Sequence, residues 1–131
     1  MDPAQFQKIK EAFARQGKTI TTEEDALRYL DFKGAEGATL NAETILLRPG
    51  ASPSTVFEEL IHSAQFRTGR LEEWTKLYGN SNAVRKAEYE AATKLVANQA
   101  KYGISDAEHA INLQRMHEFE VELLERGVPL D

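Results

Sequence analysis

Residues 44–65 read TILLRPGASPSTVFEELIHSAQ, and this stretch decides how the chain folds. The apolar run Ile45-Leu46-Leu47 predicts a strand, and Pro49-Gly50 is a turn that ends it. Ser52-Pro53 is typical of a helix start, because a serine hydroxyl can accept a backbone N–H and proline at the first helical position has no N–H to lose. The stretch therefore predicts a strand, a turn and then a helix.

The predicted helix has two faces. Residues at i, i+4 and i+7 share a helical face, so Glu58, His62 and Gln65 form a polar stripe with Glu59 beside it. Two carboxylates and an imidazole one turn apart can hold a metal ion and supply a general base. An apolar stripe faces the core and consists of Val56, Phe57, Leu60, Ile61 and Ala64.

The polar stripe also has a simpler interpretation, because many amphipathic helices carry Glu, His and Gln on a face that only meets solvent. The spacing of Glu58 and His62 does not separate a metal site from such a face. Both interpretations stay open at this point.

A carboxylate on a later helix favours the metal site. This helix is predicted over residues 83–102, and Glu88 lies at helical spacing from its apolar residues Val84, Ala91, Ala92 and Leu95. A carboxylate on the buried side needs a cation, a hydrogen-bond network or a metal. Glu88 is therefore a candidate third ligand, and an ion pair with Arg67 or Arg48 is the alternative.

Other candidate ligands are less well placed. The chain has no cysteine, so a metal must be held by His, Asp or Glu. His109 and His117 both fall on the predicted last helix without i, i+4 spacing, and His117 is the first substitute if a second imidazole is needed. Glu90 and Gln65 are further secondary candidates.

The remaining pattern predicts an α+β fold that is mainly α. We expect a single domain over 1–131, with N-terminal helices in 1–33, an antiparallel β-hairpin in 34–50, and the motif helix and C-terminal helices in 52–131. Within these parts we expect helices near 3–16, 23–30, 71–78 and 105–126 and strands at 39–41 and 43–48. The last helix should begin with a capping box of Ser105 and Glu108.

Composition excludes several classes of protein. The net charge of −5 argues against nucleic-acid binding, which needs clustered Lys and Arg. Trp74, Tyr78 and Tyr89 are accordingly expected in the core or at its edge rather than as a platform for bases. Nothing resembles a signal peptide or a membrane span. We expect a cytoplasmic domain, or one delivered into a target cell as part of a larger secreted protein.

Residues 44–65 resemble the zincin-like metallopeptidase domains at the C-termini of bacterial polymorphic toxins. In these a strand leads into a helix bearing His-Glu-x-x-His-x-x-Gln or its Glu-Glu-x-x-His relative, here Glu58 to His62. Residues 85–95 resemble the following helix with its acidic ligand, and the turn at 102–108 also fits.

The resemblance implies a toxin or effector that cleaves a peptide or protein substrate, is opposed by an immunity protein, and uses Zn²⁺. By the same resemblance, Glu58, His62 and Glu88 would be the ligands and Glu59 the general base.

The sequence departs from the commoner motif at Glu58, which stands in the place of a histidine. A site with two carboxylates and one imidazole resembles a site for Mn²⁺ or Ca²⁺ more than it resembles a standard catalytic zinc site. We therefore expect Zn²⁺ at this site, with Mn²⁺ or no metal as the alternatives. The alternative function is a catalytically degenerate, metal-free protein-interaction domain. A third and weaker alternative is another toxin class, such as a nuclease, which the acidic charge disfavours.

Overall fold

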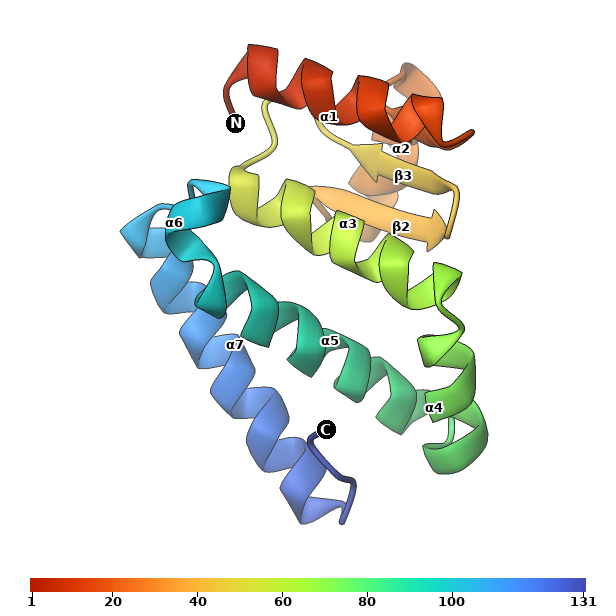
Figure 1. Ribbon diagram of the computed structural model, residues 1–131, viewed down its shortest axis with the longest axis vertical. Coiled ribbons are helices and arrows are strands. Elements are labelled where there is room, and N and C mark those ends of the chain that lie inside the picture. Colours follow the sequence, from red (N-terminus) through yellow and green to blue (C-terminus); the bar gives the residue numbers. More distant parts are fainter. The chain divides into compact units, whose positions relative to one another are not determined.

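The structure is a computed structural model that describes all residues from Met1 to Asp131. Its seven helices and three strands confirm an α+β fold that is mainly α. In chain order the elements are α1 (Pro3–Arg15), β1 (Thr19–Thr21), α2 (Glu24–Lys33), β2 (Gly37–Asn41), β3 (Thr44–Leu47), α3 (Pro53–Arg67), α4 (Arg70–Tyr78), α5 (Asn80–Ala97), α6 (Gln99–Tyr102) and α7 (Asp106–Glu125) (Figure 1).

The chain divides into two compact units, residues 1–64 and 65–131. The expected single domain over 1–131 stays a prediction. No helix combines the length and the apolar character needed to cross a membrane.

The sheet of the first unit has the strand order β1-β3-β2. β2 and β3 form the predicted antiparallel hairpin, but β1 adds to β3 in parallel, so the sheet is mixed. The sequence pattern does not predict β1, because three residues are too few to show alternation. β3 consequently has a neighbour on both sides, and β2 is an edge strand.

Both faces of this small sheet are covered, because side chains alternate along β3. Ile45 and Leu47 lie in a core with Phe13 of α1 and Val56 of α3. Leu46 points to the other face and packs with residues of α2, Ala26 and Leu30. α3 is thus one of the elements that cover the first face, which fixes the direction of its polar residues.

Hydrogen bonds hold α3 at its start and in its middle. The Ser52 hydroxyl accepts from the Thr55 N–H at 3.2 Å, which confirms the predicted cap. Further along, the Ser63 hydroxyl donates to the Ala42 carbonyl oxygen at 2.7 Å. Ser63 is buried, so this bond fixes the helix beside the β2–β3 turn.

In the second unit α5 packs against α4 and α7. The predicted helix over 83–102 ends where expected, at Tyr102 before Gly103, but it starts earlier and is broken near its end. α5 already begins at Asn80, and it stops at Ala97, with the short α6 after it. At the break, the side-chain amide of Asn98 donates to the Lys94 carbonyl oxygen at 2.8 Å, a local bond that competes with helix continuation.

The last helix begins as the sequence predicts. The Ser105 hydroxyl accepts from the Glu108 N–H at 3.2 Å, and α7 then runs to Glu125.

Candidate functional site

Glu58 and His62 form a close pair on α3. Glu58 Oε1 lies 3.7 Å from His62 Nε2, as the i, i+4 spacing predicts. The two side chains are only 18% and 16% exposed. They are therefore not a simple solvent face, and the pair offers one carboxylate and one imidazole at a partly dehydrated position.

Glu59 points toward β2. Its side chain is buried, and the Thr39 hydroxyl lies 3.0 Å from Glu59 Oε1 and 2.9 Å from the Glu59 carbonyl oxygen. A hydroxyl carries one hydrogen, so it donates to one of these two acceptors at a time. Gly37 leaves room for this arrangement, because a Cβ there would come within 3.1 Å of Glu59 Cγ.

Gln65 takes part in a hydrogen-bond network with Glu90. The Gln65 amide is buried and donates to the Ala87 carbonyl oxygen at 3.0 Å and to Glu90 Oε1 at 3.1 Å. Arg70 also donates to Glu90, and the Lys94 ammonium lies 3.7 Å from it. The two secondary candidates therefore bind one another, and Glu90 also pairs with two cations.

Glu88 is half-buried rather than buried. The apolar side of α5 is made by Ala83, Ala87, Ala91, Ala92 and Leu95. Val84, which is expected on that side from its spacing, is 55% exposed. The Glu88 carboxylate therefore lies at the border of the packed face, with its side chain 25% exposed.

The cation beside Glu88 is Arg115 of α7, whose Nη2 donates to Glu88 Oε2 at 2.6 Å. The alternative prediction, an ion pair of Glu88 with Arg67 or Arg48, is wrong. Arg48 pairs with Asp31 at 2.7 Å, and Arg67 lies in an exposed position. Spacing along α5 gives no information about which distant helix packs against it, so Arg115 could not be found that way.

Glu58, His62 and Glu88 form a group that could hold a metal ion, with one ligand atom from each. One imidazole nitrogen and two carboxylate oxygens are donors that zinc and manganese accept. His117 is not part of this group. It is an exposed residue of α7, 3.6 Å from Glu120. His109 is half-buried, and its Nδ1 has no hydrogen-bond partner.

Comparisons with protein-family models, curated proteins and solved structures give no match to this chain. The similarity of residues 44–65 to a zincin-like motif therefore stays a prediction.

Proposed function

We propose that this chain is a metal-dependent hydrolase that cleaves a peptide bond in a peptide or protein substrate. Glu58, His62 and Glu88 are the proposed ligands, and Glu59 is the proposed general base. The observation that carries the proposal is the group of Glu58, His62 and Glu88, which could hold a metal ion. Zinc is the proposed metal, with manganese as the alternative.

The bonding of Gln65 supports Glu88 as the third ligand. Gln65 follows His62 by three residues on α3, and residues at i and i+3 share a helical face. Its amide binds the Ala87 carbonyl and the Glu90 carboxylate, which lie one residue before and two residues after Glu88.

The proposed chemistry divides between metal and protein. A divalent ion at these ligands would polarise the scissile carbonyl and make a bound water more acidic. Glu59 would take the proton of that water and pass it to the leaving amine. Thr39 holds the Glu59 carboxylate by a hydrogen bond and so limits its rotation.

The edge strand β2 is the proposed position for an extended substrate. The central strand β3 cannot take this role, because it already pairs with β1 and β2. β2 has a neighbour on one side only, and its Thr39 binds Glu59. A peptide that adds to β2 as a further strand would bind beside the proposed base.

The resemblance of residues 44–65 to toxin domains supports a biological role for this activity. We propose that the domain acts as a toxin or effector after delivery into a target cell. An immunity protein that protects the producing cell is then the expected partner.

A metal-free interaction domain is the second candidate function. Two carboxylates of the proposed site already have hydrogen-bond donors within the chain, which favours this alternative. Glu59 accepts from Thr39, and Glu88 accepts from Arg115. A polar network of this kind can stabilise a fold without a metal. Under this alternative, the function would lie in binding a partner through the helices.

Metal analysis separates the two functions. The purified chain is stripped with a chelator, reloaded with Zn²⁺ or Mn²⁺, and its bound metal is measured by mass spectrometry and calorimetry. A hydrolase should bind about one ion per chain, as expected for a three-ligand catalytic site. Glu58→Ala, His62→Ala and Glu88→Ala should each lose it.

His117→Ala and Glu118→Ala are the matched controls, because both are exposed residues of α7 outside the group. They should keep the ion. Absence of bound metal after loading with either ion would contradict the hydrolase and support the interaction domain.

A further inference from the structure

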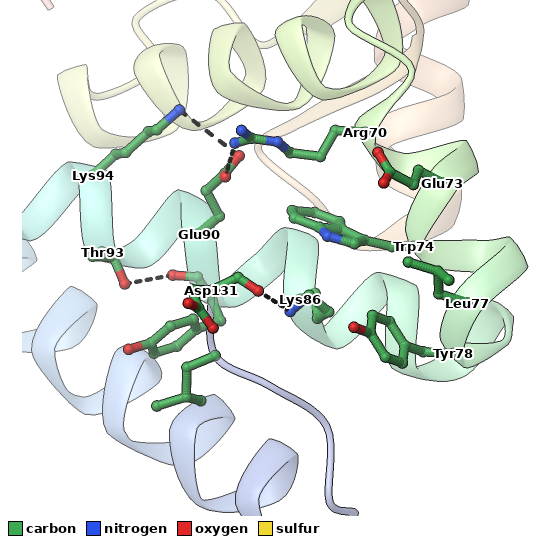
Figure 2. A pocket seen from close by; sticks show the side chains of 12 residues that line it. Arg70, Glu73, Trp74, Leu77, Tyr78, Lys86, Glu90, Thr93, Lys94 and Asp131 are labelled. Carbon is green, nitrogen blue, oxygen red and sulfur yellow. Dashed lines mark hydrogen bonds and ion pairs between the residues drawn. The ribbon is translucent and has the colours of Figure 1, made fainter.

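The second unit contains a pocket that holds none of the proposed metal ligands and not the proposed base. Its volume is about 560 Å³, and its lining comes from α4, α5 and the last two residues of the chain, Leu130 and Asp131 (Figure 2). Pockets that hold small organic molecules have volumes of about 300–1,000 Å³. The size therefore fits a small ligand.

The charged groups of this lining compensate one another. They are three cations and three side-chain carboxylates, those of Arg70, Lys86, Lys94, Glu73, Glu90 and Asp131. Arg70 and Lys94 both pair with Glu90. The side chains of the lining thus carry no net charge, and an ionic ligand gains no overall attraction from them.

Lys86 is the buried cation of this lining, and it is offset within the chain. Its side chain is only 2% exposed, and Nζ donates to the main-chain oxygens of Pro129 and Asp131. The rings of Trp74 and Tyr78 lie 5.4 Å and 5.2 Å from Nζ and add cation–π contacts. A charged ligand would therefore lose its hydration without meeting an unpaired opposite charge at Lys86.

Most of the remaining lining is apolar or aromatic and consists of Trp74, Leu77, Tyr78, Tyr89 and Leu130. In Figure 2 the rings of Trp74 and Tyr78 extend from α4 toward Lys86 of α5, so they form one wall of the pocket. An aromatic ring that packs on this wall would bury apolar surface and could stack on the ring faces or edges.

The same aromatic residues offer hydrogen-bond donors. The indole N–H of Trp74 and the hydroxyls of Tyr78 and Tyr89 make no hydrogen bond within the chain, because the bonds of Tyr78 and Tyr89 use their main-chain oxygens. An indole N–H can only donate, and a phenol hydroxyl can donate or accept. These groups therefore suit a neutral carbonyl or hydroxyl of a ligand.

We propose that this pocket binds a small neutral molecule with an aromatic body and a carbonyl or hydroxyl group. The aromatic body packs on Trp74 and Tyr78, and the polar group accepts a hydrogen bond from the indole or phenol groups. Charged analogues are disfavoured, because they give up hydration and find no net counter-charge. This proposal does not depend on the hydrolase, because every lining residue belongs to residues 65–131.

The chain has one tryptophan, so the fluorescence of Trp74 reports on this pocket directly. The full chain is titrated with three compounds that share one aromatic body, the neutral 4-phenylbutanamide, the anion 4-phenylbutanoate and the cation 4-phenylbutylamine. The amide should bind at least about tenfold more tightly than either ion, which corresponds to about 1.4 kcal/mol. An ion that binds as tightly as the amide, or no change with any compound up to about 10 mM, would overturn the proposal.

Leu77→Gln tests whether the amide binds in this pocket. Leu77 belongs to the lining and is 62% exposed, so the substitution should leave the fold intact. The affinity for the amide should fall by about three- to tenfold, because part of the apolar contact is lost. Leu124→Gln is the matched control, since Leu124 is 59% exposed and lies on α7 outside the lining. Equal affinities of the two variants would place the amide elsewhere.

Glu73→Gln tests the selection by charge. Without this carboxylate the lining has one more cation than it has side-chain carboxylates. The affinity for 4-phenylbutanoate should then rise at least about twofold relative to the amide, although solvent screens an exposed charge. Glu72→Gln is the control, because Glu72 is exposed on the same helix and lies outside the lining. An equal ratio of the two affinities in both variants would contradict the proposed selectivity.

Discussion

Arg115 Nη2 on α7 lies 2.6 Å from Glu88 Oε2 on α5 and donates a hydrogen bond to it. The two side chains are 29% and 25% exposed, so the pair is largely shielded from solvent. A carboxylate has two oxygens, and one can accept from an arginine while the other serves as a metal ligand. The ion pair is thus compatible with a ligand role for Glu88 and would orient it.

Removal of Arg115 alone should destabilise the protein. Arg115→Met leaves the Glu88 carboxylate half-buried without this cation, and we expect a loss of about 1–3 kcal/mol in the free energy of unfolding. Glu88→Gln combined with Arg115→Met should recover most of the loss, since both charges of the pair are then removed. Urea unfolding of both single variants and the double variant measures the coupling. Strictly additive effects would show that the pair contributes nothing.

Thr39 should matter for stability through its bond to Glu59. Thr39→Val keeps the shape of the side chain but removes the hydroxyl that donates to the buried carboxylate. We expect a loss of about 1–3 kcal/mol in unfolding free energy, because a hydrogen bond to a charged group is lost. Thr19→Val on β1 is the control, because Thr19 is exposed. An equal effect of both substitutions in urea unfolding would contradict this role of Thr39.

Glu59→Gln should separate catalysis from metal binding. The amide keeps the size of the side chain but cannot take a proton from water, so peptide cleavage should fall by about 10²–10⁴-fold while bound metal is retained. Cleavage of a mixture of unstructured peptides, followed by mass spectrometry, measures the activity. Glu72→Gln, at an exposed position of α4, is the control. Full activity of Glu59→Gln would remove Glu59 from the mechanism.

Local sequence signals predicted the parts of the fold that depend on neighbours along the chain. The strand, turn and helix of residues 44–65 were predicted correctly, and so were the caps at Ser52 and Ser105. The approach of Glu58 and His62 was predictable for the same reason, because helical spacing alone brings them together.

Features that depend on packing between distant segments were not predicted. β1 is a strand because three residues pair with β3, which no local pattern reveals. The partner of Glu88 comes from α7, and the buried side of α5 includes Lys86, a residue type that sequence patterns place on the surface. The orientation of α5 and its contacts decide these features, and neither is visible in spacing.

Lys86 should make the stability of the protein depend on pH. Its folded-state pKa lies below the usual 10.5, because burial disfavours the ammonium form. The cost of burying the charge is therefore fully present below the folded pKa. Between that value and 10.5 the unfolded chain binds more protons than the folded one, so the free energy of unfolding rises with pH in this window.

Comparison with Lys86→Met isolates this effect from the other groups that titrate at high pH. The stability of the unmodified chain, relative to Lys86→Met, should increase as the pH is raised from neutral toward 10.5. Urea unfolding of both chains at a series of pH values gives the difference, with the exposed Lys101→Met as a further reference. A difference that stays flat or falls with pH would mean that burial does not disfavour the charged form of Lys86.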